Sequence, residues 1–397
     1  MSIGTMKQRI ALLTLPLHAN YGGILQCYAL QTVLERMGCE VTVLNRRMGS
    51  KELTVALLLL RCLSVVKCAF RRYVLGQKQW LVRSPWAEEY VPNVQHTLRQ
   101  SARKSLDEFV LGHIHLTRPI RSAEEMRRSV PETLIDAFVV GSDQVWRERY
   151  AMGITDFFLG FLPDTDTRRR VAYGASFGTE HVDISQGKLA ECKRLARRFT
   201  AVSVREQSAV QLARDVLGVD ARWVLDPTML LQAGDYHFPG RSGSMCWRGL
   251  VTYILDPSAG KSQVVGSTAG ALSLPVMALS LNPVDEEGLP MSMLPVEEWL
   301  SAFAQADFVV TDSFHGCVFS IINRKPFIAI ANGERGMARF TSLLDHFGLR
   351  DRLVLSLEDY QQRRASLLAP IDYAPVAGLQ AQARESSLAF LREALGC

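Results

Sequence analysis

Short apolar runs alternate with amphipathic stretches along most of the chain, and this alternation constrains the fold more than any other feature of the sequence. Residues 137–140, 201–204 and 308–311 are apolar runs of this kind, whereas residues 24–37 have helical periodicity, with Gln26 and Gln31 off the apolar stripe. Strands buried on both faces have such runs, and helices return the chain between parallel strands. The alternation predicts an α/β protein with doubly wound parallel sheets.

The length of the chain predicts two domains, because 397 residues exceed the roughly 150–200 that share one core. Residues 234–248 contain glycines and a proline but few apolar residues, which is typical of a linker. We therefore expect an N-terminal Rossmann-like domain over residues 1–235, with a helical insertion at about 45–135. A second Rossmann-like domain, with C-terminal helices, is expected over residues 246–397.

Polar residues and glycines gather where the expected strands end. In open α/β sheets, ligands bind outside the carboxyl ends of the strands, so two such sheets predict a site in a cleft between two domains. The candidate residues on the first sheet are Asn20, Gly22, Gly23, Ser142, Asp143, Gln144, Ser176, Arg205 and Asp226, and those on the second are Asp312, Ser313, His315 and Gly316.

His315 is the most informative single residue. It follows the apolar strand expected at 308–311 and precedes a helix expected at 317–323, which puts it at a helix amino end in the predicted cleft. We interpret it as the centre of an active site. Asp312 has two interpretations that stay open: it caps the helix, or it orients the imidazole.

Two further features favour an anionic ligand. Arg205 ends a buried strand and could present its guanidinium fork to a carboxylate or phosphate, or form a salt bridge with a neighbour such as Glu206. The segment 20–23 could bring a helix amino end close to an anion, or it could be a plain tight turn. A net charge of +5 is mild for this length, and no basic run is interleaved with aromatics, so nucleic acid is not an expected partner.

The eight cysteines predict a reducing compartment, because none forms a CxxC pair or has the spacing of a zinc site. We expect no metal or cofactor, no secretion signal at residues 1–8, and a cytoplasmic protein. The segment from Leu53 to Leu75 has two interpretations. It is an ordinary packed helix, or a basic, apolar helix that lies on the inner-membrane surface as a peripheral contact.

Several stretches together resemble the polysaccharide pyruvyl transferase family: residues 20–31, 138–146, 203–206, 225–228 and 306–316, with Arg339-Phe340. The resemblance implies a two-domain fold like that of GT-B glycosyltransferases. It implies phosphoenolpyruvate as donor, a sugar of a cell-surface polysaccharide or its lipid-linked precursor as acceptor, and a cyclic pyruvate ketal as product. It also implies His315 as the acid/base residue and Arg205 as a donor-binding residue.

One position departs from the family. Relatives often carry arginine two residues before this histidine, where the chain has Ser313. Either Arg147, Arg335 or Arg339 binds the donor in place of that arginine, or the donor differs. Two rival functions therefore stay open: a glycosyltransferase that uses a nucleotide sugar, and a non-catalytic assembly protein of the polysaccharide machinery.

The charge of His315 is predicted to follow the donor. A helix amino end disfavours imidazolium by ~0.3–1 kcal/mol. A donor anion ~4 Å away favours it by about 4 kcal/mol at an effective dielectric of ~20. We expect a neutral His315 in the free protein and a charged one with donor bound.

Overall fold

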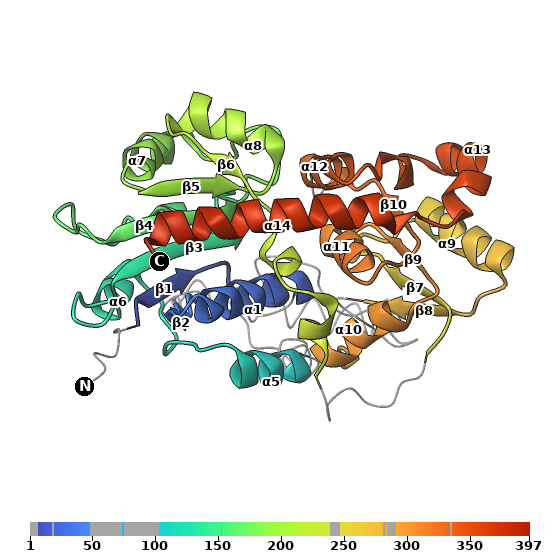
Figure 1. Ribbon diagram of the computed structural model, residues 1–397, viewed down its shortest axis with the longest axis horizontal. Helices are drawn as coiled ribbons and strands as arrows, with labels where there is room; N and C mark the ends of the chain where they lie inside the picture. The colour runs from blue at the N-terminus through green and yellow to red at the C-terminus, as the bar shows by residue number, and fades with distance from the viewer. Residues whose placement is uncertain are drawn as a thin grey trace.

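The computed structural model describes residues 7–17, 20–47, 74, 103–151, 153–238, 247–280, 283, 291–333 and 336–397. Two all-parallel sheets lie beside each other, which confirms the predicted α/β class (Figure 1). The six-stranded sheet contains β1 (Arg9–Leu13), β2 (Glu40–Val43), β3 (Ala137–Asp143), β4 (Arg169–Ala175), β5 (Ala201–Val204) and β6 (Arg222–Trp223). The five-stranded sheet contains β7 (Leu250–Tyr253), β8 (Val276–Leu279), β9 (Phe308–Thr311), β10 (Phe327–Ile330) and β11 (Leu353–Val354).

Both sheets are wound in the same order. The first runs β2-β1-β3-β4-β5-β6 and the second β8-β7-β9-β10-β11, so β1 and β7 each lie between the next two strands of their own half. The order reverses between β1 and β3 and between β7 and β9. Such switch points are where open α/β sheets bind ligands, because the connections on either side leave in opposite directions.

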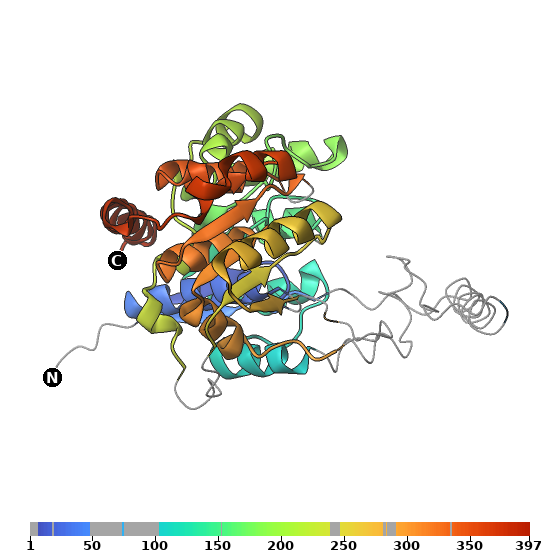
Figure 2. The same ribbon diagram turned by 90° about the vertical axis from the view of Figure 1, so that its right-hand side faces the viewer.

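Helices surround both sheets, and Figure 2 shows α9, in yellow, across the face of the second sheet. The helices are α1 (Tyr21–Arg36), α5 (Lys104–His113), α6 (Ala123–Arg128), α7 (Gln186–Ala196), α8 (Gln207–Leu212), α9 (Ala259–Leu272), α10 (Val296–Gln305), α11 (Phe314–Ile322), α12 (Ala338–His346), α13 (Leu357–Leu368) and α14 (Tyr373–Leu395). Among the described residues, no helix combines the length and the apolar character that crossing a bilayer requires. The segment from Leu53 to Leu75 lies outside the described residues, apart from Val74.

The two halves share buried contacts. Tyr21 of α1 stacks on Trp299 of α10 with ring centroids 5.2 Å apart, and its hydroxyl donates to the Leu294 carbonyl at 2.8 Å. The long helix α14 runs from the second half back along the first (Figure 1). There the Leu225 amide donates to Ser387 Oγ at 3.0 Å. The predicted domain boundaries stay a prediction, and the last helix belongs to both halves by its contacts.

Two helices begin earlier than their periodicity predicts. Helix α1 starts at Tyr21 because the Asn20 side chain accepts a hydrogen bond from the Gly22 amide, and α11 starts at Phe314 because Ser313 accepts from the Gly316 amide. Both are side-chain caps, which replace hydrogen bonds that a helix end lacks. As a result Gly22 and His315 lie in first helical turns rather than in the turns before them.

Candidate functional site

His315 is fixed by the tight passage from β9 into α11. Thr311 Oγ1 donates to the Tyr253 carbonyl at 2.7 Å and accepts from the Ser313 amide at 3.0 Å, while the Gly316 amide donates to Ser313 Oγ at 3.4 Å. A Cβ on Gly316 would lie 2.2 Å from Thr311 Oγ1, so this position requires glycine. Ser313 and Gly316 thus hold the helix start; their donor-binding role stays a prediction.

The amino end of α1 lies directly against the imidazole. A Cβ on Gly22 would fall 2.0 Å from His315 Nδ1, whereas one on Gly23 would meet only Asn20, at an ordinary 3.6 Å. Glycine at position 22 is therefore what allows the two elements to touch. The segment 20–23 is the start of a helix rather than a plain tight turn, and two helix amino ends, one from each half, meet at His315.

Asp226 supplies the carboxylate that faces the imidazole. Its Oδ2 lies 3.7 Å from His315 Nε2 and also accepts from Arg205 Nη1 at 2.5 Å. The other oxygen accepts from the Thr228 amide at 3.0 Å and from Thr228 Oγ1 at 2.6 Å. Burial opposes ionisation, but His315 and Arg205 outweigh it and hold the pKa of Asp226 well below its usual range. This carboxylate is therefore a stable anion beside the histidine.

Asp312 is placed differently from either interpretation of its sequence position. The cap of α11 is Ser313, so Asp312 as the N-cap is wrong. Its carboxylate is fully buried and accepts from Lys261 Nζ at 2.6 Å, and from the Leu255 amide at 2.6 Å. It also accepts from Asn332 Nδ2 at 3.1 Å. These contacts tie β7 and α9 to the end of β9, whereas Asp226 faces the imidazole; a catalytic role for Asp312 stays a prediction.

Arg205 directs its fork at two carboxylates, and neither belongs to Glu206. Nη1 contacts Asp226, and Nη2 contacts Asp143 Oδ1 at 3.1 Å. Burial disfavours the cation, but Asp226 and Asp143 raise the pKa of Arg205 above its usual range. The buried Nε has no hydrogen-bond partner among the described residues, so one donor of the guanidinium is left for a ligand.

The end of β3 contributes one side chain to this cluster. Asp143, at a left-handed φ of 67°, reaches Arg205. Ser142 is fully buried, with its amide donating to Gln26 Oε1 at 2.9 Å and its hydroxyl to the Gly174 carbonyl at 3.1 Å. Gln144 accepts from Arg147 Nη1 at 3.0 Å. The structure therefore brings Asp143 to Arg205 and uses Ser142 and Gln144 in the surrounding framework.

Arg339 is the arginine that lies in this cluster in place of one at position 313. Its guanidinium lies 5.6 Å from the centroid of the Phe314 ring, and that of Arg205 lies 4.6 Å from the same ring. Burial and the neighbouring Arg205 lower the pKa of Arg339 to about 10, so its positive charge would gain from an added anion. Arg147 instead contacts Gln144 and is 3.4 Å from Asp183. Arg335 lies outside the described residues.

Two residues of the site escaped the sequence reasoning. Gln26 is fully buried, although it lies off the apolar stripe, because its amide donates to Thr14 Oγ1 and to the Gly23 carbonyl, both at 2.8 Å. It joins the start of α1 to the ends of β1 and β3. The other is Glu206, which is buried beside Arg205 and was considered only as a salt-bridge partner.

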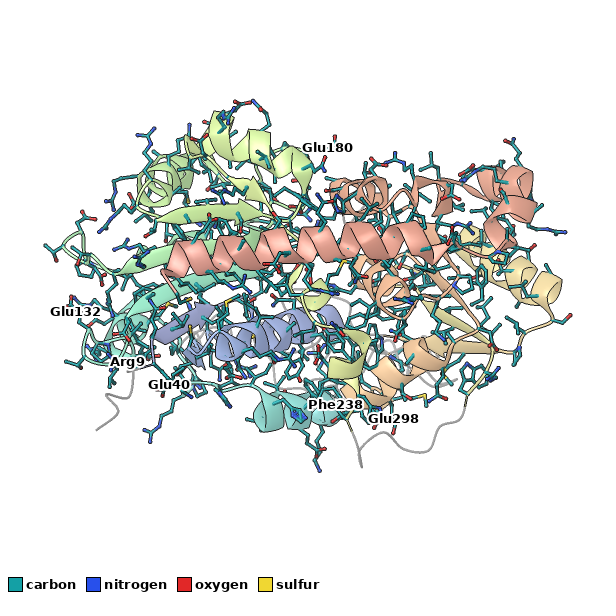
Figure 3. The ribbon with its side chains drawn as sticks, in the orientation of Figure 1. Arg9, Glu40, Glu132, Glu180, Phe238 and Glu298 are labelled. Atoms are coloured by element: carbon teal, nitrogen blue, oxygen red, sulfur yellow. The ribbon has the colours of Figure 1, made fainter. Side chains whose placement is uncertain are left out.

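Surface acids such as Glu132 and Glu180, labelled in Figure 3, lie by contrast at the edge of the molecule.

Across the part of the chain that the structure describes, no three His, Cys, Asp or Glu side chains are grouped so that they could hold a metal ion. What the cluster does contain is one imidazole, two arginines, three buried acids and two helix amino ends. This combination can bind an anion and move a proton.

Comparisons with known proteins give a family and a fold. The family model described as "Polysaccharide pyruvyl transferase" matches residues 20–334. No curated protein matches the chain. Among solved structures, a protein of Listeria monocytogenes described as a putative UDP-N-acetylglucosamine 2-epimerase is 10% identical with a TM-score of 0.51, over 98% of this chain and 96% of that one. Arabidopsis thaliana UGT89C1, complexed with UDP-L-rhamnose, is 10% identical with a TM-score of 0.50, over 98% and 100%.

A third structure, a mutant O-GlcNAc transferase of Thermobaculum terrenum, is 14% identical with a TM-score of 0.44. The match covers 98% of this chain and 64% of that one, so the chain spans less than two thirds of that protein. At such identities the likenesses concern the fold alone. The Listeria structure agrees with the two parallel sheets in confirming a two-domain, GT-B-like architecture.

Proposed function

Because the chain belongs to the polysaccharide pyruvyl transferase family, we propose that it transfers the enolpyruvyl-derived group of phosphoenolpyruvate onto a sugar. The acceptor belongs to a cell-surface polysaccharide or its lipid-linked precursor, and the product is a pyruvate ketal. The observation that carries the proposal is the buried contact of His315 with Gly22 and Asp226, beside two arginines. It supports an acid/base group placed against a site for an anion.

The reaction moves two protons. C3 of the donor gains one, and C2 forms bonds to two sugar oxygens while its bond to the phosphate oxygen breaks. The two hydroxyls lose one proton each, so one of these protons is accounted for at C3 and the other on the released phosphate. His315 gives the proton to C3 and recovers one from the first hydroxyl, a role worth roughly 10²–10⁴ in rate.

The charges around His315 favour a donor with more than one negative group. The amino ends of α1 and α11 favour anions within their first turn. Arg339 has a lowered pKa and gains from an anion, and Arg205 offers Nε. We assign the phosphate to the neighbourhood of Arg339 and the carboxylate to the helix amino ends. Asn20, Gly22 and Gly23 form one of these ends, and Ser313 and Gly316 form the other.

The acceptor side is assigned to the ends of β3 and β6, where Asp143 and Asp226 are buried acids and Ser142 and Gln144 form the framework. The rival function, glycosyl transfer from a nucleotide sugar, is supported only by the fold of structures such as the one complexed with UDP-L-rhamnose. The family match favours pyruvyl transfer over it.

The test is incubation of the purified protein with phosphoenolpyruvate and candidate lipid-linked sugars. Wild type should release phosphate and increase the acceptor mass by pyruvate less water, and His315→Gln should do neither. The proposal fails if phosphoenolpyruvate stays intact with every acceptor while a nucleotide sugar is consumed with release of its nucleotide. Unchanged turnover by His315→Gln would contradict the proposed acid/base role of His315.

A further inference from the structure

Glu206 is a buried acid that the assignments above do not use. It lies two residues after the end of β5 and is 1% exposed. Its Oε1 is hydrogen-bonded to Ser176 Oγ, whereas Oε2 is buried and has no hydrogen-bond partner among the described residues. A buried polar atom without a hydrogen-bond partner destabilises the folded state, and such atoms in native structures call for an explanation.

Glu206 lies on the seam between the two halves. The next residue, Gln207, donates its amide to Ser342 Oγ of α12 at 3.1 Å. Ser342 is three residues after Arg339, so both lie on one face of α12. The charges that act on Glu206 come from Arg205 at the end of β5 and from Arg339 on α12. Glu206 therefore shares its surroundings with the proposed donor site.

The surroundings favour the neutral acid. Burial raises the pKa of Glu206, and although Arg205 and Arg339 oppose this, they do not overcome it. Ser176 Oγ already accepts from the Gly178 amide at 3.0 Å, so its own hydrogen can go to Glu206 Oε1. In the protonated form of Glu206 the acid proton resides on Oε2, the oxygen without a protein partner among the described residues. A neutral carboxyl with a free donor beside two arginines is suited to give its proton to an anion.

We propose that Glu206 is a second proton-transfer residue of this active site and acts together with His315. The inference rests on the proposed function, in which two protons move. As the bond from C2 to the phosphate oxygen breaks, Glu206 Oε2 gives its proton to that oxygen. The second sugar hydroxyl then closes the ring on C2 and returns its proton to Glu206. Between these steps the carboxylate is stabilised by Arg205 and Arg339.

The test variant is Glu206→Gln, which keeps the shape and a contact for Ser176 but has no acid proton. We expect kcat to fall roughly 10²–10⁴-fold with little change in the KM for phosphoenolpyruvate. Glu206→Asp keeps the acid and should retain more activity. Glu180→Gln, at an exposed glutamate, is the matched control and should behave as wild type.

Two measurements test whether Glu206 is protonated, as its proposed role requires. Glu206→Gln should be more stable than wild type at neutral pH, because a carboxyl with a raised folded-state pKa loses stability as the pH rises through its unfolded value. The infrared difference between wild type and Glu206→Gln should contain the carbonyl band of a protonated acid at neutral pH. An ionised carboxylate in that spectrum, or full kcat in Glu206→Gln, would overturn the inference and leave the proposed function intact. No phosphate release by wild type would overturn both.

Discussion

Adding one methyl group at Gly22 should displace His315 without unfolding the protein. The Cβ of Gly22→Ala would lie 2.0 Å from Nδ1, 2.3 Å from Cγ and 2.6 Å from Cε1 of the imidazole. Ordinary contact begins at 3.4 Å, so the ring must move by about 1.4 Å. Since a misplacement of ~1 Å at a catalytic group costs ~10²-fold, we expect kcat to fall by at least that factor.

The stability effect of Gly22→Ala has two opposing parts. Position 22 lies in a helix with no positive φ, so alanine gains about 0.8–1 kcal/mol of helix propensity. Overpacking against the imidazole costs about 1–3 kcal/mol. The net loss in the free energy of unfolding should therefore stay below about 2 kcal/mol, and the variant should fold.

Gly23→Ala is the matched control, because it makes the same change one residue along and its Cβ meets only Asn20, at 3.6 Å. The assay is phosphate release from phosphoenolpyruvate in the presence of acceptor, with urea denaturation of both variants. Equal activity of Gly22→Ala and Gly23→Ala would refute the placement of His315 against α1. The placement would also be refuted if unfolding of Gly22→Ala accounted for its whole loss of activity.

Further predictions concern the charged neighbours of the histidine. Asp226→Asn should lower kcat and, by leaving a buried arginine short of a partner, cost about 3–5 kcal/mol of unfolding free energy. The folded-state pKa of Asp226 is lowered, so the loss in unfolding free energy of Asp226→Asn should have its full size above pH ~4 and vanish as the pH falls further. Denaturation of both proteins at several pH values measures it. Asp312→Asn, which loses its pair with Lys261, should lower the melting temperature, and a lower kcat of the folded fraction would support the predicted catalytic role of Asp312. Arg339→Gln should raise the KM for phosphoenolpyruvate roughly 10–100-fold, from the loss of about 1.5–3 kcal/mol of charged hydrogen bonding.

The fold could be predicted from the sequence because its information is local. Buried parallel strands are short apolar runs, and the runs expected at 201–204 and 308–311 coincide with β5 and β9. The strand ends then locate the site, since the carboxyl ends of the strands meet at one edge. Apolar periodicity predicts helix starts that are too late. A cap such as Asn20 or Ser313 adds residues to the start of the helix that do not belong to its apolar stripe.

The partners within the site could not be predicted in the same way. Asp312 is three residues before His315, and Asp226 is far from it in sequence, yet Asp226 is the one that faces the imidazole. The pairing depends on how the two sheets face each other, and no local pattern encodes that. The burial of Gln26 could not be predicted for a related reason. A polar residue off the apolar stripe is expected at the surface, and only the packing of α1 on β3 buries this one.

We propose that His315 delivers a proton to C3 as the phosphoenolpyruvate-derived group is transferred. The most direct test is turnover in deuterated water with phosphoenolpyruvate and a competent acceptor, followed by mass spectrometry of the product and phosphate analysis. We expect one phosphate for each ketal formed, one deuterium in the new methyl group, and loss of both in His315→Gln. A product formed without phosphate release, or a methyl group without deuterium, would contradict it.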